Sequence, residues 1–209
     1  MKKTKFIIMI LLCIILLGAI GYVAYGIYKN ATMEVKNPIV TMNVKDMGTV
    51  KIELYPDQAP NTVANFIALI QRGFYNGLTF HRTIPDFMIQ GGDKAGNGTG
   101  SPTLKDLKDD GDDTPYSING EFIANKFKNT LNHDRGVISM ARADYSSIGL
   151  VEEGYNSAGS QFFITTKEQT SLDGLYAAFG KVIEGMEVVD AISNVEVVTR
   201  DETAEEGLD

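Results

Sequence analysis

One stretch decides the fold of this chain, and it reads Phe80-His81-Arg82-Thr83-Ile84-Pro85-Asp86-Phe87-Met88-Ile89-Gln90-Gly91-Gly92-Asp93. An apolar run that ends at a glycine pair predicts a strand followed by a turn. Alternate residues of an extended segment share a face, so Arg82, Met88 and Gln90 are expected to line one surface. Pro85 must bend this strand or place it at a sheet edge. The resulting surface, apolar with one cation, suits either an ordinary barrel strand or a binding site.

Length and composition fit one globular domain with an appendage. The chain has 209 residues, of which 44% are hydrophobic and 22% are charged. The formal net charge is −8, although residues 1–30 contain four lysines and no acid, so the rest is strongly acidic. An acidic domain repels phosphate backbones, and we expect no nucleic-acid partner. The only cysteine, Cys13, lies in the apolar N-terminal segment, which excludes an intrachain disulfide.

The N-terminal segment has the composition of a membrane anchor. Residues 6–28 carry no charge, and at ~1.5 Å per residue a helix of that length crosses a ~30 Å hydrocarbon core. Lys2, Lys3 and Lys5 precede it and only Lys29 follows, a bias that keeps the N-terminus in the cytoplasm and the domain outside. We therefore expect a single-pass membrane protein held by a signal anchor. Its parts would be a basic stub (1–5), a transmembrane helix (6–28), a linker (29–37), a globular domain (38–200) and an acidic tail (201–209). Cleavage of the segment as a secretory signal, which would release the domain, is the alternative.

The domain itself is expected to consist of short strands and two helices. Alternation at 40–44 and 50–54, around a turn at 46–48, predicts a hairpin with one buried face. Pro60 opens a helical stripe that ends before Gly73, made of Val63, Phe66, Ile67 and Ile70. A second stripe follows Gly185, and residues 195–198 form a candidate closing strand. Many short strands with two helices indicate a closed all-β architecture.

Three blocks of the chain, in this order, resemble the cyclophilin family of peptidyl-prolyl cis-trans isomerases. They are the stretch 80–93, the pair Gly136-Val137-Ile138-Ser139-Met140-Ala141-Arg142 and Asn156-Ser157-Ala158-Gly159-Ser160-Gln161-Phe162-Phe163-Ile164-Thr165, and Leu172-Asp173-Gly174-Leu175-Tyr176-Ala177-Ala178-Phe179-Gly180-Lys181-Val182. The similarity covers approximately residues 38–200. It implies a mainly β fold: a closed eight-stranded antiparallel β-barrel capped by two α-helices. It also implies a rotamase without cofactor or metal, acting on proline-containing polypeptides as a monomeric domain.

The same resemblance assigns roles to ten residues. Arg82 is the catalytic arginine, and Gln90 helps to position the substrate and the guanidinium. The proline pocket is matched by Phe87, Met88, Phe163 and Leu172, and the positions that contact the peptide backbone by Ala141, Arg142 and Gln161. Tyr176 stands where eukaryotic members carry a histidine and can still wall the pocket. Ser171 stands where they often carry a tryptophan, and Arg142 replaces a more usual asparagine.

Prolyl isomerisation requires no nucleophile, metal or proton relay. Rotation about an X–Pro bond faces a barrier of ~18–20 kcal/mol because amide resonance must be broken. An enzyme need only bind the twisted amide better than the planar forms, and Arg82 can donate to the prolyl nitrogen when it regains its lone pair. We therefore expect a peptidyl-prolyl cis-trans isomerase that assists the folding of exported proteins.

Two other classes of protein remain open beside the isomerase. A non-catalytic peptide-binding or chaperone module on the same fold would keep the apolar groove without needing Arg82, and the intact pair with Gln90 speaks against it. Two histidines are too few for a zinc site, and His81 is expected to make a structural hydrogen bond. Ser157 and Ser160 have no evident histidine partner, which argues against a serine hydrolase.

Overall fold

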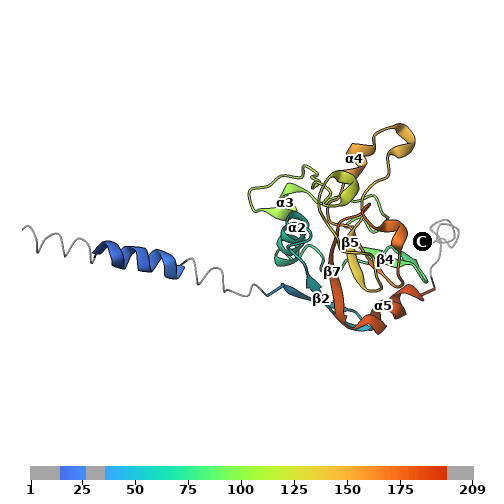
Figure 1. Cartoon of the computed structure of the whole chain (residues 1–209). Coiled ribbons are helices and arrows are strands. Elements are labelled where there is room, and N and C mark those ends of the chain that lie inside the picture. The colour runs from blue at the N-terminus through green and yellow to red at the C-terminus, as the bar shows by residue number, and fades with distance from the viewer. Residues whose placement is uncertain (1–14, 27–35, 197–209) are drawn as a thin grey trace, which may run out of the picture. The chain divides into compact units, whose positions relative to one another are not determined.

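The computed structural model describes residues 15–26 and 36–196. Contacts divide the chain into two units, Met1–Lys36 and Asn37–Asp209. In the first unit residues 15–26 form a helix (Figure 1). Within the described ranges, no helix combines the length and the apolar character needed to span a membrane. This finding contradicts the predicted transmembrane helix, of which residues 6–14 and 27–28 lie outside the described part.

The second unit is built on one antiparallel sheet of seven strands. In chain order they are β1 (Ile39–Val44), β2 (Gly48–Leu54), β3 (Arg82–Ile84), β4 (Met88–Gly91), β5 (Val137–Met140), β6 (Phe162–Thr165) and β7 (Ala178–Glu184). Their spatial order is β1-β2-β7-β5-β6-β4-β3, which leaves β1 and β3 at the two edges. The predicted hairpin is confirmed, because β1 and β2 pair from Ile39↔Glu53 to Val44↔Gly48.

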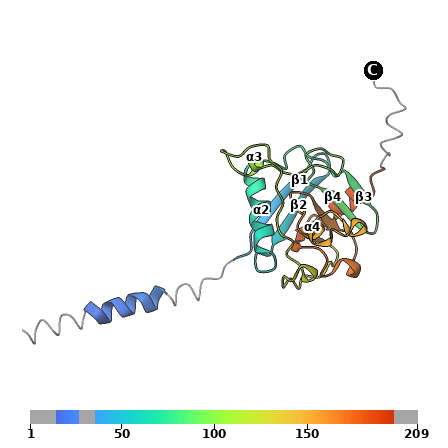
Figure 2. The ribbon, with the colours of Figure 1, turned by 90° about the horizontal axis from the view of Figure 1, so that it is seen from above.

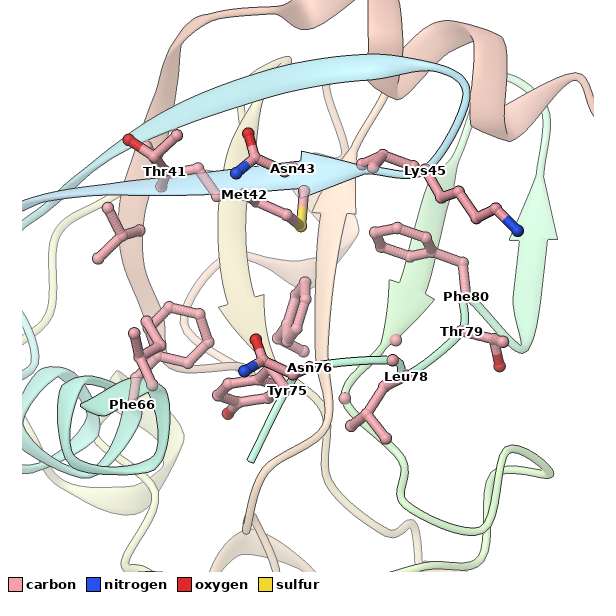
Figure 3. Close-up of a pocket in the computed structure, with 18 residues that line it drawn as sticks. Thr41, Met42, Asn43, Lys45, Phe66, Tyr75, Asn76, Leu78, Thr79 and Phe80 are labelled. Atoms are coloured by element: carbon pink, nitrogen blue, oxygen red, sulfur yellow. The ribbon is translucent and has the colours of Figure 1, made fainter. Parts of the chain in front are cut away.

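The closed eight-stranded barrel is wrong, since the strands form an open half-barrel. The expected closing strand does not start where the sequence placed it. The helix before it ends at Ser193, the Asn194 N–H donates to the Asp190 carbonyl, and Val195 and Glu196 are not in a strand. Residues 197–198 lie outside the described part. With no described strand on its outer side, β1 borders a cavity of about 540 Å³, into which Met42, Phe66, Tyr75 and Phe80 point (Figure 3).

Two helices complete the core, as predicted. They are α2 (Pro60–Gln71) and α5 (Met186–Ser193), which Figure 1 shows on different sides of the sheet. The buried stripe of α2 differs slightly from the prediction, because Leu69 is fully buried whereas Ile70 is 36% exposed. Phe66 packs edge-on against Phe162 and Phe179, at ring-centroid distances of 5.6 and 5.1 Å. Shorter helical segments lie in the loops: α3 (Leu104–Leu107), η1 (Ile123–Asn125), η2 (Ser146–Ile148), α4 (Val151–Tyr155) and η3 (Thr170–Leu172).

A buried carboxylate satisfies the start of α2. Glu121 is 2% exposed and accepts from the backbone N–H groups of Asn61 at 3.0 Å and Thr62 at 2.8 Å. The Thr62 hydroxyl adds a bond of 2.7 Å. The first N–H groups of a helix have no intrahelical acceptor, and a negative charge there also complements the helix dipole. Glu121 therefore links the loop before η1 to a helix sixty residues away in sequence.

The deciding stretch folds as a tight hairpin rather than as one bent strand. β3 and β4 pair antiparallel, with Arg82 opposite Gln90 and Ile84 opposite Met88. The Phe87 N–H closes the turn by donating to the Ile84 carbonyl at 3.2 Å, and Asp86 takes a left-handed conformation with φ 57°. Pro85 lies in this turn, where no ladder N–H is required. Arg82, Met88 and Gln90 thus share one face through cross-strand pairing as well as through alternation.

Candidate active site

A second cavity, of about 160 Å³, is lined by residues of β3, β4 and β6 and of the loops near them. Its lining brings together nine of the ten residues that the sequence had assigned to the site: Arg82, Phe87, Met88, Gln90, Ala141, Arg142, Phe163, Leu172 and Tyr176. The larger cavity beside β1 contains none of them. Gln161, the tenth residue, is not part of the lining and acts through a hydrogen bond to Gln90 described below.

The floor and one wall of the small cavity are apolar and aromatic. Met88 is 1% exposed and Phe163 is 5% exposed, because they belong to the central strands β4 and β6. Tyr176 meets the Phe163 ring edge-on, with centroids 5.6 Å apart and planes at 87°. Leu172 closes the same side from η3. A cavity of this size, with a floor of closely packed side chains, can hold one compact apolar ring.

The guanidinium of Arg82 is held at the rim by a chain of side-chain amides. Its Nη1 lies 3.4 Å from Gln90 Oε1 and 3.8 Å from Met88 Sδ. Gln90 Nε2 donates to Gln161 Oε1 at 3.1 Å, and Gln161 Nε2 donates to the carbonyls of Gly98 and Gly100. These two carbonyls can only accept, so they orient Gln161, which in turn orients Gln90 with its oxygen toward Arg82.

The loop at the end of this chain is itself ordered by Asp93, the last residue of the deciding stretch. Asp93 is 1% exposed and accepts from the backbone N–H groups of Ala95, Asn97 and Gly98 at 2.6 to 2.9 Å. Burial raises the pKa of the Asp93 carboxyl, but these donors outweigh burial and hold the pKa below its ordinary value. The sequence analysis gave Asp93 no role, although an aspartate before a glycine-rich loop is a signal for such a turn.

A buried histidine supports the pocket from below, and the sequence analysis missed it. His133 is 1% exposed and stacks on Phe163, with ring centroids 5.9 Å apart and planes at 14°. Its Nδ1 lies 3.0 Å from Asp173 Oδ1, and its Nε2 lies 3.1 Å from Ser139 Oγ. Burial lowers the pKa of the His133 ring, against the opposing effect of Asp173. A neutral ring that donates from Nδ1 and accepts at Nε2 satisfies both neighbours.

This Ser139-His133-Asp173 chain resembles a hydrolase triad only in its order of residues. Ser139 is fully buried in β5, where it lies opposite Phe163, so its hydroxyl cannot reach a substrate. The expectation that His81 makes a structural hydrogen bond is wrong, because neither of its ring nitrogens has a partner among the described residues. His133 has that role instead, since the tertiary fold brings Asp173 to it.

Arg142 lines the cavity at a position that the resemblance matched to contacts with the peptide backbone. Its Cζ lies 4.6 Å from the ring centroid of Tyr176, 4.9 Å from that of Tyr155 and 5.6 Å from that of Phe122. Nε donates to the Leu175 carbonyl at 3.0 Å, and Nη1 to the Ala143 carbonyl at 3.1 Å. Arg142 therefore joins three separate loops at the rim of the pocket.

Known proteins resemble this domain in sequence and in structure. The family described as "Cyclophilin type peptidyl-prolyl cis-trans isomerase/CLD" matches residues 39–207. Peptidyl-prolyl cis-trans isomerase B of Bacillus subtilis is 40% identical over 155 residues, which cover 74% of this chain and 90% of that protein. A peptidyl-prolyl cis-trans isomerase of Synechococcus elongatus is 40% identical over 162 residues, covering 74% of this chain and 92% of its own.

A solved structure extends the likeness to three dimensions. The crystal structure of a Cryptosporidium parvum cyclophilin type peptidyl-prolyl cis-trans isomerase, determined in the presence of the dipeptide Ala-Pro, is 34% identical with a TM-score of 0.58. The match covers 72% of this chain and 82% of that one. Since the family match spans most of the domain and the relatives are covered nearly end to end, the chain belongs to the cyclophilin-type peptidyl-prolyl cis-trans isomerases.

Proposed function

We propose that Arg82 accelerates rotation about X–Pro bonds by donating a hydrogen bond to the prolyl nitrogen as the amide twists. The observation that carries this proposal is the position of its guanidinium, at the rim of a cavity with an apolar floor and 3.4 Å from Gln90 Oε1. In the planar amide the nitrogen lone pair is delocalised and accepts no hydrogen bond. In the twisted amide the lone pair returns, so the interaction strengthens in the transition state alone, which lowers the barrier.

The substrates are proline-containing polypeptides, with the proline ring on the floor made by Met88 and Phe163. The size and apolar character of the floor support this choice, and so does the related cyclophilin crystallised in the presence of Ala-Pro. The working unit is a monomeric domain, as the resemblance to the family implies.

The domain acts outside the cytoplasm, where it assists the folding of exported proteins. The sequence before the domain supports this part of the proposal, because Lys2, Lys3 and Lys5 precede the uncharged residues 6–28 and only Lys29 follows them. To test it, protease is added to spheroplasts of cells that express the chain with a C-terminal tag. Loss of the tag in intact spheroplasts is expected, whereas a tag protected until lysis would refute an external location.

Catalysis is tested on the full chain by NMR exchange between the cis and trans forms of a peptide with one Ala-Pro bond. Uncatalysed exchange takes tens to hundreds of seconds, so acceleration appears as exchange cross-peaks that the peptide alone lacks. Chemical-shift changes on binding without cross-peaks would instead favour a non-catalytic peptide-binding module. The same peptide with the proline replaced by alanine controls for binding that does not involve the proline ring.

A further inference from the structure

The described part of the chain has four arginines, and they fall into two pairs. Arg72 and Arg135 form salt bridges, with Asp109 and Asp190 respectively. Arg82 and Arg142 line the small cavity, and neither makes a salt bridge with a carboxylate of the described residues. The cavity thus has two guanidinium groups and no acidic residue in its lining, although the chain has a formal net charge of −8.

The guanidinium of Arg142 is fixed in place and keeps donors to spare. Three aromatic rings surround its Cζ within 5.6 Å, and Nε and Nη1 donate to backbone carbonyls. Nη2 donates to no acceptor among the residues that the structure describes. An arginine carries five N–H donors in a rigid fork, so an immobilised guanidinium with a free edge is preorganised for a carboxylate. Because the rings and carbonyls already hold the side chain, a bound carboxylate costs little additional side-chain entropy.

We propose that Arg142 makes the enzyme selective for substrates with a glutamate or aspartate directly beside the proline. This inference rests on the proposed function, since it places the proline ring on the floor next to Met88 and Phe163. A residue adjacent to that ring then lies within reach of the rim, where Arg142 stands. A carboxylate there neutralises a guanidinium that has no carboxylate partner among the described residues, and such charge-assisted bonds are stronger than bonds between neutral groups.

The two arginines, Arg82 and Arg142, act on different parts of the substrate. Arg82 contacts the reacting amide, so its effect is common to every X–Pro substrate. Arg142 binds a side chain that does not react, so its effect depends on the sequence of the substrate. The measurable quantity is therefore the ratio of kcat/KM for an acidic peptide to kcat/KM for its uncharged counterpart, because any general loss of activity cancels in this ratio.

The test uses the full chain and four peptides that differ at one residue beside the proline: Ala-Glu-Pro-Phe, Ala-Gln-Pro-Phe, Ala-Pro-Glu-Phe and Ala-Pro-Gln-Phe, all with blocked ends. Exchange rates are measured by NMR at low and high salt. We expect the wild type to favour one Glu peptide over its Gln counterpart by about three- to tenfold at low salt. The preference should decline with added salt, because the rim is open to solvent.

Three variants assign the preference to a residue. Arg142→Met keeps a long side chain without charge, and we expect its ratio to fall to about one. Arg142→Lys keeps the charge but loses the fork, so it should retain part of the preference. Arg72→Met, which removes a paired arginine away from the cavity, should leave the ratio as in the wild type.

Other outcomes would overturn the proposal. Equal rates for the wild type on each Glu and Gln pair would exclude acidic selectivity. If Arg142→Met still preferred the Glu peptide, the preference would come from Arg82 or from the overall electrostatic potential of the site. Should Arg142→Met fail to fold by circular dichroism, the salt dependence of the wild type and the Arg142→Lys ratio still decide. Absence of acceleration on all four peptides would instead refute the proposed catalytic function.

Discussion

His133 Nδ1 lies 3.0 Å from Asp173 Oδ1, and the His133 ring stacks on the Phe163 ring that forms the floor of the pocket. The same carboxylate oxygen accepts from the His133 backbone N–H at 2.7 Å, so Asp173 is bound twice. Leu172 and Tyr176, which wall the pocket, flank Asp173 in the chain. The His133–Asp173 contact therefore attaches the loop that contains Leu172 and Tyr176 to the segment that leads into β5.

Stability should depend on pH through His133. Its pKa is lowered by burial, so between that pKa and the ordinary value of ~6.5 the unfolded chain binds more protons than the folded one. The free energy of unfolding should be constant above pH ~6.5 and fall as pH drops below it, by at most ~1.4 kcal/mol per pH unit for one group. Urea unfolding of the wild type between pH 7.5 and 5.5 measures this slope.

Two variants identify the residue responsible for that slope. The pKa of His81 is also lowered, mainly by burial, so it contributes in the same direction. His133→Gln should lower stability at pH 7.5 by about 1–3 kcal/mol, because buried partners lose their bonds, and should reduce the slope. His81→Gln, which removes no hydrogen bond of the described residues, serves as the control. A slope that disappears in His81→Gln and persists in His133→Gln would contradict the assignment.

Removal of the Arg82 guanidinium should reduce catalysis far more than binding. Arg82→Ala is expected to lower kcat and kcat/KM together by about 10²–10³, since the lost interaction is made only with the twisted amide. Arg82→Lys should recover little, because an ammonium cannot keep the contact with Gln90 while facing the substrate. Phe163→Ala is the matched contrast, since it removes the pocket floor and should weaken peptide binding as well as rate. Near wild-type NMR exchange by Arg82→Ala at saturating peptide would exclude this mechanism.

Loss of the buried charge at the start of α2 should destabilise the domain. The Glu121 carboxylate accepts four hydrogen bonds, all from Asn61 and Thr62. In Glu121→Gln one oxygen is replaced by a donor that faces other donors, and we expect a loss of about 2–4 kcal/mol in the free energy of unfolding. The control is Glu184→Gln, which removes an exposed salt bridge to Lys51 and should change stability by less than about 1 kcal/mol. Equal urea midpoints for the two variants would disprove the capping role.

The response to cyclosporin should depend on Ser171. By resemblance to eukaryotic cyclophilins, a tryptophan at this position contributes its indole N–H and broad face to the inhibitor, and serine offers neither. Weak inhibition of the wild type is expected, with tighter inhibition of Ser171→Trp and little change in peptide turnover. The substitution is sterically open, because Ser171 is exposed on η3. If both proteins were inhibited at the same concentration, the correspondence of this position would be wrong.

The amino-acid sequence by itself determined the local elements, and its resemblance to the cyclophilins predicted which residues line the small cavity. Alternation and turn residues predicted the hairpin of β1 and β2, and the apolar stripes predicted α2 and α5, because these patterns reflect interactions between near neighbours in the chain. The three blocks that resemble the cyclophilin family named ten residues, and nine of them line one cavity. The hairpin of β3 and β4 was not predicted, because a single strand bent by Pro85 or placed by it at a sheet edge was expected there.

Only the tertiary structure decided the features that depend on residues distant in sequence. It contradicted the closed barrel, because no described strand lies outside β1, and it contradicted the transmembrane helix within the described residues. It placed Asp173 on His133, Glu121 on the start of α2, and two tyrosines around Arg142. Hydrogen-bond partners and cation–π contacts of this kind leave no periodic trace in a sequence. They arise only when the sheet brings separate loops to the same rim, and so Arg142 became part of the pocket through its side chain.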